Sequence, residues 1–418
     1  MMNKTILCID LKAFYASVEC VERKLDVLTT DLAVIDIERS KNSICLSVSN
    51  SLKKKGLNSR CRYLELPKNL DIVIAKPRMK LYVEKSSEIV DIFLNYVSYE
   101  DIHIYSIDEA FLDITKYLKM NKMSDIEMAR SIVNEIYVKL GLIATCGISY
   151  NLFMAKCCLD NDAKNNKKNG YISKWDENDV KNKLWKISPI SKMWGIGRNQ
   201  ERKLNSLGIN SIGDLANYDV NVLKDIFGVI GEEMYQHANG IDLSEISEAQ
   251  KLDKDKSLSV GETLYRSFNK EELDLIVKDA IENLCVRLRK KKKIGNVVSI
   301  GIGFDDNNGG CGGTIKIGHY TQDEDEIYKY CLIIINRHYK GENIKKINVS
   351  LGNLVDESFI ETSLFEDLEQ KIKEKKVNTI LDEINEKYNK GTIYKARNNL
   401  ENSTYLNRRK LIGGHNAE

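Results

Sequence analysis

The stretch "YSIDEAFLDIT", residues 105–115, sets two adjacent acids, Asp108 and Glu109, between two short apolar runs. On either side, "DIHIYSID" and "AFLDIT" have the alternation of β-strands, so the sequence predicts two strands with the acids at their junction. Neighbouring carboxylates repel and shift each other's pKa unless a cation neutralises them. Taken alone, such a pair is more common in a solvated hairpin than in a functional site.

The segments around this hairpin predict an α+β sheet. "TILCIDL", residues 5–11, is an apolar strand that contains Asp10 near its end, and the spacing that follows, in residues 12–25, is helical. Residues 85–98, before the hairpin, and residues 126–141, after it, have helical patterns. Residues 142–149 have the pattern of a buried strand. The order helix, two strands, helix, strand, completed by the N-terminal strand, is typical of a split βαβ sheet with helices on one face.

The remainder of the chain predicts further units. Strand patterns lie at residues 31–37 and 43–49, and residues 171–245 contain short helical patterns broken by glycine. After the polar stretch 244–256, a second α+β unit follows. A charged helix at residues 369–388 leads into an expected tail.

Composition narrows the class of protein. A length of 418 residues indicates about two to four domains. No stretch approaches the roughly 18 to 20 apolar residues of a membrane span, and Asp10 and Lys12 interrupt the N-terminal apolar run, so we expect a cytoplasmic protein. Ten cysteines without a C-x-x-C pair favour buried free thiols over a zinc site, and the net charge of +2 does not decide whether nucleic acid is a partner.

The strand positions suggest chemistry for the acids. If Asp10 ends one strand and Asp108 and Glu109 join two others in the same sheet, all three carboxylates converge at one edge. Oxygen ligands without histidine or cysteine favour a hard cation, Mg²⁺ or Mn²⁺. Two such ions about 3.5 to 4 Å apart support in-line phosphoryl displacement.

Four segments, in order, resemble the Y-family DNA polymerases of the DinB and UmuC type: "CIDLKAFYASVE", "YSIDEAFLDIT", "GISYNLFMAKCCLDNDAK" and "WGIGRNQERKLNSLGI". The resemblance runs from residue 4 to about residue 355 and is closest to the UmuC-like branch of Gram-positive bacteria and their mobile elements. It implies a multidomain α+β right hand with a ferredoxin-like palm. The implied parts are the palm (1–13 and 79–170), fingers (14–78), helix-hairpin-helix thumb (171–243), linker (244–256), α+β little finger (257–355) and C-terminal helix and tail (356–418).

The same resemblance implies the catalytic residues. Asp10, Asp108 and Glu109 would be the catalytic, metal-binding carboxylates for two Mg²⁺ ions, or Mn²⁺, with the carbonyl oxygen of Leu11 as a further ligand. Asp108 would share both ions with Asp10, while Glu109 would mainly serve the ion that activates the primer hydroxyl. The implied reaction is attack of a primer 3′-hydroxyl on the α-phosphate of a nucleotide, with release of pyrophosphate.

The implied nucleotide site draws on three segments. Tyr15 would stack under the sugar and exclude a 2′-hydroxyl, beside Phe14, although an aromatic residue on a helix is more often simply buried. Further nucleotide-binding positions are Ser47, Lys53 and Lys164. The chain departs from the family pattern in three places: Lys12 replaces a small or polar residue, Asn50 replaces a tyrosine, and the spacing from Lys156 to Lys164 is one residue longer than in many members.

The implied DNA contacts lie further along. "MWGIGRNQERKL" fits a helix-hairpin-helix in which Gly195 and Gly197 let backbone amides approach a phosphate, with Arg198 and Lys203 following. Six of the seven residues 287–293 are basic, which indicates either helix capping in solvent or DNA binding through Lys290, Lys291 and Lys292.

"ETSLFED", residues 361–367, resembles a peptide that docks on the replicative sliding clamp. Leu364 and Phe365 would be its apolar anchors, but Glu361 stands where a glutamine is expected. The competing interpretation is an apolar pair that packs against its own domain.

The function that the resemblance implies is low-fidelity translesion DNA synthesis by a monomer that binds primer-template DNA and deoxynucleoside triphosphates, without a membrane partner. Two alternatives stay open. A catalytically impaired DNA-binding or regulatory relative would explain the Asn50 and lysine-spacing departures. Another palm-fold enzyme, such as a nucleotide cyclase, would share the acids but would need neither Tyr15 nor the hairpin.

Overall fold

The computed structural model describes residues 4–38, 43–247, 256–305, 309–357, 368–388 and 391–418. The chain forms two compact units. Unit 1 comprises Met1–Ile37, Lys41–Lys76 and Lys80–Asp253, and unit 2 comprises Lys254–Glu418 with Glu38–Ser40 and Pro77–Met79. Each unit is described by itself.

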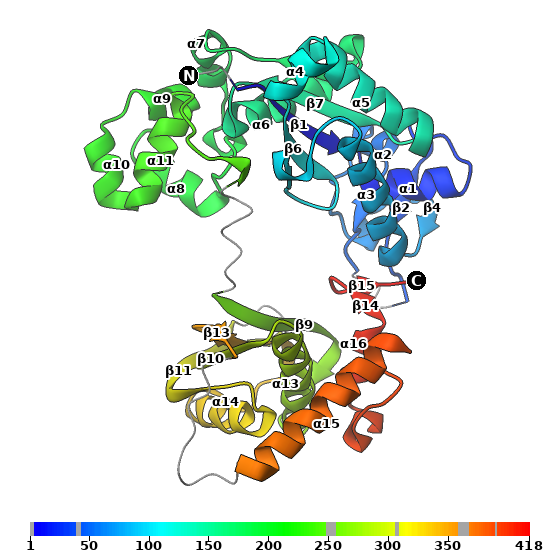
Figure 1. The fold of residues 1–418 in the computed structure, drawn as a ribbon, viewed down its shortest axis with the longest axis vertical. Helices are drawn as coiled ribbons and strands as arrows, with labels where there is room; N and C mark the ends of the chain where they lie inside the picture. The colour runs from blue at the N-terminus through cyan, green and yellow to red at the C-terminus, as the bar shows by residue number, and fades with distance from the viewer. Residues whose placement is uncertain (1–3, 39–42, 248–255, 306–308, 358–367, 389–390) are drawn as a thin grey trace. The chain divides into compact units, whose positions relative to one another are not determined.

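A five-stranded sheet organises unit 1, in the order β5-β6-β1-β7-β8. Figure 1 labels its three central strands, β6, β1 and β7. Its strands are β1 (Ile6–Leu11), β5 (Ile102–Ile104), β6 (Glu109–Asp113), β7 (Ala144–Ser149) and β8 (Ile172–Lys174). The N-terminal strand β1 is central and antiparallel to both β6 and β7, while β7 and β8 are parallel. Because β1 is buried on both faces, its sequence is almost continuously apolar.

Helices complete this part of unit 1: α3 (Met79–Leu94), α4 (Thr115–Asn121), α5 (Asp125–Leu140) and α6 (Leu152–Asn161). Helix α5 begins at a capping box, in which Ser124 and Glu127 satisfy each other's backbone amides. Helix α6 begins at Asn151, whose side chain accepts the Met154 amide, and it packs very closely on β7 at Gly147. The predicted α+β sheet with an inserted N-terminal strand is therefore confirmed.

A small three-stranded sheet, β3-β2-β4, forms a second core in unit 1. Its elements and the helices near it in sequence are α1 (Phe14–Glu22), β2 (Leu32–Val34), β3 (Ser47–Val48), α2 (Asn50–Lys54) and β4 (Val73–Ala75). Ala33, Val48 and Leu52 are fully buried in this core together with Cys45 and Cys61. The buried cysteines agree with the expectation of free thiols.

Short helices fill the last part of unit 1: α7 (Asp179–Asn182), α8 (Arg198–Ser206), α9 (Ile212–Ala216), α10 (Val220–Phe227) and α11 (Val229–Ala238). Their core includes Leu204, Ile212 and Leu223, which no solvent reaches. Glycine ends or joins several of these helices, as the broken pattern predicted.

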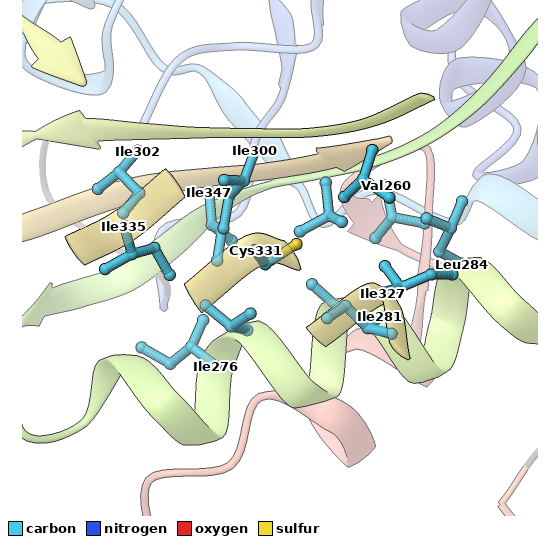
Figure 2. Close-up of a cluster of buried hydrophobic side chains, with 14 of the residues drawn as sticks. Val260, Ile276, Ile281, Leu284, Ile300, Ile302, Ile327, Cys331, Ile335 and Ile347 are labelled. Atoms are coloured by element: carbon cyan, nitrogen blue, oxygen red, sulfur yellow. The ribbon is translucent and has the colours of Figure 1, made fainter. Parts of the chain in front are cut away.

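The described residues 256–357 of unit 2 form a sheet in the order β11-β10-β12-β9, with the helices α13 and α14. The bounds are β9 (Ser257–Phe268), α13 (Leu273–Lys290), β10 (Lys293–Phe304), β11 (Gly310–Thr321), α14 (Glu324–His338), β12 (Ile344–Gly352) and the short β13 (Val355–Asp356). Figure 2 shows the apolar layer between sheet and helices, with Ile300, Ile302 and Ile347 of the sheet facing Ile276, Ile281 and Leu284 of α13.

The C-terminal segment has more structure than a tail. It contains α15 (Leu368–Lys387), α16 (Tyr405–Arg409), β14 (Leu411–Ile412) and β15 (His415–Asn416). The buried carboxylate of Asp279 on α13 accepts the Ser403 hydroxyl at 2.7 Å and the Thr404 amide at 2.9 Å. Glu282, one turn later, pairs with Arg397 at 2.8 Å. Within the described ranges, no helix is long and apolar enough to cross a membrane.

Candidate active site

The register of β1 and β6 brings the predicted acids together. Asp10 lies directly opposite Glu109, and the Leu11 amide donates to the Asp108 carbonyl oxygen at 3.0 Å. Directly opposed residues of antiparallel strands project to the same face, so Asp10 and Glu109 share one face of the sheet. Asp108 adjoins them, held by the Ser106 hydroxyl at 2.8 Å.

The turn after β1 directs the next predicted residues. Ala13 has left-handed backbone angles, φ 50° and ψ 47°, which cost a non-glycine residue roughly 1 to 2 kcal/mol. Strained backbone of this kind is often found at functional sites. The turn leads from Asp10 into α1, where Phe14 and Tyr15 are the first two residues.

Two lysines of the α6 region neutralise the acids. The Lys156 ammonium lies 2.7 Å from Glu109, and the Lys164 ammonium lies 3.2 Å from Asp10. Asp160 bridges them, with an oxygen 3.1 Å from Lys156 and one 2.8 Å from Lys164. Asp160 is not among the residues predicted from the sequence, although its spacing of four residues from each lysine is a signal that could have revealed it.

The electrostatics of the site favour added positive charge. Burial raises the pKa of Asp10 to about 6, and the charges of Asp108 and Glu109 add to that rise while Lys164 opposes it. Burial alone would lower the pKa of Lys156, but Asp160 and Glu109 raise it above its ordinary value. The thiol of Cys8 also donates to Glu109, at 3.3 Å.

The donor set fits a hard cation. Its side-chain donors are carboxylate oxygens, which Mg²⁺ and Mn²⁺ prefer. Among the described residues, however, no three His, Cys, Asp or Glu side chains converge closely enough to hold one ion. Asp10 and Glu109 are instead paired with lysines, so an ion at this edge would compete with Lys156 and Lys164 for the same oxygens.

Aromatic side chains pack next to the acids. Phe14 is buried and Tyr15 is half-buried, with the Tyr15 ring edge-on to Tyr82 at 4.9 Å between centroids. The Tyr82 hydroxyl donates to buried Glu19 at 2.6 Å, which fixes the ring of Tyr82 beside Tyr15. Burial raises the pKa of Tyr15, and the charge of Asp108 raises it further. Sequence reasoning did not identify Tyr82.

The predicted phosphate-binding residues lie on β3 and α2. Ser47 is buried in β3, and Lys53 is exposed in the last turn of α2, within electrostatic range of Asp10 and Lys164. Asn50 is only 7% exposed, and its amide nitrogen has no hydrogen-bond partner within the described part of the chain. A buried donor without a partner carries a desolvation cost, so this amide is an unusual feature of the segment.

The predicted DNA hairpin joins the sheet through Trp194. Its ring lies 5.9 Å from Phe111 of β6, and its nitrogen donates to the Tyr105 hydroxyl at 3.2 Å. Gly195 has φ +93°, and a Cβ added at Gly195 or Gly197 would meet nothing within 4 Å. Arg198 and Lys203, both exposed, follow on α8, and they form no ion pair with the residues that the structure describes.

The predicted basic run of unit 2 is partly engaged by the chain itself. Lys290 lies 2.6 Å from Glu386 of α15, and Arg289 lies 2.6 Å from Asp382. Lys291 and Lys292 are exposed after the end of α13. The structure therefore gives Lys290 a protein partner that the sequence analysis did not anticipate. The predicted clamp anchors Leu364 and Phe365 lie outside the described residues.

The outer face of the unit 2 sheet is another candidate surface that sequence reasoning missed. Two rows of small or polar residues cross its four strands, Gly312, Gly301, Asn348 and Gly261 in one and Thr314, Ser299, Ser350 and Ser259 in the other. All are exposed or half-buried. The alternation of small polar with large apolar residues along these strands could have indicated this face.

Comparison with known proteins identifies the family. The model described as "impB/mucB/samB family" matches residues 9–160, its C-terminal domain matches residues 255–364, and its helix-hairpin-helix motif matches residues 177–209. "Putative UV-damage repair protein UvrX" of Bacillus subtilis is 37% identical, over 99% of this chain and 98% of that protein. "DNA polymerase IV 2" of the same species is 30% identical, over 99% of both chains.

The fold comparison agrees. A solved Y-family DNA polymerase chimera superimposes with a TM-score of 0.68 at 21% identity, covering 84% of this chain and 99% of that chain. The right-hand polymerase architecture that the resemblance implied is thus confirmed. With family matches across both units and relatives of equal length, this chain belongs to the impB/mucB/samB family, the Y-family DNA polymerases, and is a nucleotidyltransferase of that class.

Proposed function

We propose that this protein copies damaged DNA, extending primers past altered template bases with low fidelity. One observation carries the proposal: Asp10 and Glu109 face each other across β1 and β6, and the ammonium groups of Lys164 and Lys156 lie against them. Phosphoryl transfer requires carboxylates that can bind cations next to a lysine that can bind phosphates, and this site has both.

The residues of the chain would divide the work as follows. Asp10, Asp108, Glu109 and the Leu11 carbonyl oxygen would hold two Mg²⁺ ions. When bound, such ions make a primer hydroxyl a better nucleophile and neutralise charge on the phosphates. The protein itself performs little covalent chemistry, so its contribution is to position the reactants.

The nucleotide would be bound by groups from both sides of the acids. Lys164 would contact the phosphates as a positive charge, with Ser47 and Lys53 as further contacts. The amide of Asn50, which has no hydrogen-bond partner among the described residues, would donate to the same phosphates once a side-chain rotation exposes it, where other family members use a tyrosine. Tyr15, held against Tyr82, would lie under the sugar and clash with a 2′-hydroxyl.

DNA would be held by backbone amides and basic side chains, without reading of bases. Gly195 and Gly197 leave their amides open to a phosphate, and Arg198 and Lys203 add charge beside them. In unit 2, Lys290, Lys291 and Lys292 would contribute contacts, and Lys290 would first have to leave Glu386. Affinity should therefore fall steeply as salt rises.

Primer extension tests the proposal. The native chain is incubated with Mg²⁺, the four deoxynucleotides and primed templates, one intact and one carrying an abasic site, beside Asp108→Ala. We expect extension on both templates by the native chain and none by the variant. If the native chain binds primed DNA but adds no nucleotide, it is instead a catalytically impaired relative.

A further inference from the structure

The residue two positions after Asp10 is fixed at its main chain on both sides. The Lys12 amide donates to the Ile143 carbonyl oxygen at 2.9 Å. Its own carbonyl oxygen accepts the Ser17 hydroxyl at 2.6 Å. Lys12 is therefore anchored between β1 and α1, and the direction in which its side chain leaves the backbone is set.

The side chain of Lys12 reaches a segment 152 positions away. Its ammonium donates to the main-chain carbonyl oxygen of Lys164 at 2.8 Å. The same ammonium lies 4.0 Å from the centroid of the Tyr171 ring, which is a favourable cation–π distance. A charged donor on a partly buried carbonyl oxygen is among the stronger hydrogen bonds of a protein.

Lys164 lies in a segment that needs such support. It is the middle residue of a 3₁₀ turn, η3 (Ala163–Asn165), which has only the Asn165 and Asn166 amides bonded within it, at 3.0 Å each. Short 3₁₀ turns have poorer hydrogen-bond geometry than α-helices, so contacts from outside decide where they lie. Lys12 supplies one such contact, the one at the backbone of Lys164.

The other end of Lys164 is held by acids. Its ammonium lies 3.2 Å from Asp10 and 2.8 Å from Asp160. Lys164 is thus held at two points by residues at or just after the end of β1. Lys12 donates to its carbonyl oxygen, and Asp10 pairs with its ammonium. Asp162 and Asn166, on either side of the turn, are anchored to Ser173 at 3.0 and 2.9 Å, so loss of the Lys12 contact would release the backbone at Lys164 itself and leave the flanks in place.

We propose that Lys12 is a positioning residue that holds the main chain of Lys164, so that the Lys164 ammonium is presented beside Asp10 to the phosphates of the incoming nucleotide. The inference rests on the proposed function, in which Lys164 contacts those phosphates. Lys12 itself does not touch the nucleotide, because its ammonium is engaged by a carbonyl oxygen and a ring.

Single substitutions separate position from charge. Lys12→Met removes the donor and keeps the apolar stem, and we expect the nucleotide KM to rise about tenfold, the usual effect of one hydrogen bond to a charged group, with DNA affinity unchanged. Lys12→Arg, which keeps a donor and a cation for Tyr171, should restore most of the lost nucleotide affinity.

Lys54→Met is the matched control, because Lys54 is an exposed lysine whose charge also reaches Lys12 but which does not contact Lys164. A KM that rises equally in Lys54→Met would overturn the proposal in favour of a simple charge effect.

A double variant tests whether Lys12 acts through Lys164. In the Lys164→Ala background, Lys12→Met should add nothing further, whereas effects that multiply independently would overturn the proposal. A second readout is equilibrium binding of dATP to the protein on a dideoxy-terminated primer facing template thymine, where Lys12→Met should weaken dATP binding about tenfold.

Two controls keep the outcomes distinguishable. Tryptophan fluorescence during urea unfolding checks that Lys12→Met folds; if it does not, Lys12→Gln, too short to reach the carbonyl oxygen, takes its place with the same expected rise. A native chain that extends primers while the folded variant has native KM and dATP affinity would overturn this inference alone. A native chain that binds primed DNA and extends nothing would instead overturn the proposed function.

Discussion

Adding one methyl group at Gly147 should damage both the stability of unit 1 and the active site. Gly147 lies on β7 opposite Cys8, under helix α6. A Cβ built there would lie 2.4 Å from the Ala155 carbonyl oxygen and 2.4 Å from the Leu159 amide nitrogen. Both atoms belong to the backbone of α6, so no side chain can rotate away.

The distances set the size of the effect. Ordinary contacts of a Cβ begin near 3.4 Å, so α6 must move by about 1 Å in Gly147→Ala. Overpacking of this kind costs about 1 to 3 kcal/mol, and the rigid partners place Gly147→Ala near 3 kcal/mol. A shift of that size also moves Lys156 from its 2.7 Å contact with Glu109, and misplacement by about 1 Å can slow catalysis by roughly 100-fold.

Urea unfolding, followed by tryptophan fluorescence, measures how much the substitution lowers the free energy of unfolding of unit 1. All three tryptophans, Trp175, Trp185 and Trp194, lie in unit 1, so their fluorescence reports on that unit. We expect the midpoint of Gly147→Ala to fall by about 1 M urea. Gly197→Ala adds the same methyl group where nothing lies within 4 Å and should cost less than about 1 kcal/mol. An unchanged midpoint for Gly147→Ala would refute the close approach of α6 and β7.

Three further predictions follow from individual contacts. Tyr15→Ala should lower the ratio of kcat/KM for deoxynucleotides over ribonucleotides, and an unchanged ratio would reject Tyr15 as the sugar gate. Burial would raise the pKa of Asp242, but the His237 ring nitrogen 3.7 Å away and two backbone amides hold this pKa at about 2. These amides, of Ser244 and Phe153, each donate to the carboxylate at 2.9 Å. Asp242→Asn should therefore destabilise unit 1 by about 2 kcal/mol above pH 4, and the difference should shrink as the pH falls toward the folded-state pKa, which unfolding measured between pH 3 and 7 can detect. Ser403→Ala removes a 2.7 Å bond to buried Asp279 and should lower the exchange protection of α13 amides in unit 2 by about 1 to 3 kcal/mol; native protection would show that the C-terminal segment does not stabilise α13.

Local patterns in the sequence predict much of this fold. The apolar run of β1, the alternation around Asp108 and the capping box at Ser124 each depend on residues within a few positions of one another. Motifs have the same local character, which is why the acids, the lysines and the hairpin glycines could be chosen from the sequence. The buried cysteines and the absence of zinc spacing also follow from composition.

Tertiary structure decides the contacts between distant segments. Asp279 and Glu282 look like solvent-facing positions of α13, because charged residues are rarely buried, yet the C-terminal segment covers and pairs them. Lys290 likewise forms an ion pair with Glu386, 96 positions away.

The active site also contains contacts between segments that are far apart in the sequence. Three acids and two lysines could be chosen from the sequence, but the contact of Lys12 with the carbonyl oxygen of Lys164 and the packing of Tyr82 against Tyr15 could not. The sequence alone therefore determined which elements form and which residue types carry the chemistry, since periodicity and motifs are local. The packing of strands and helices decided which of those residues meet, because a hydrogen bond or ring contact between distant segments forms only when the whole core brings their backbones to one place.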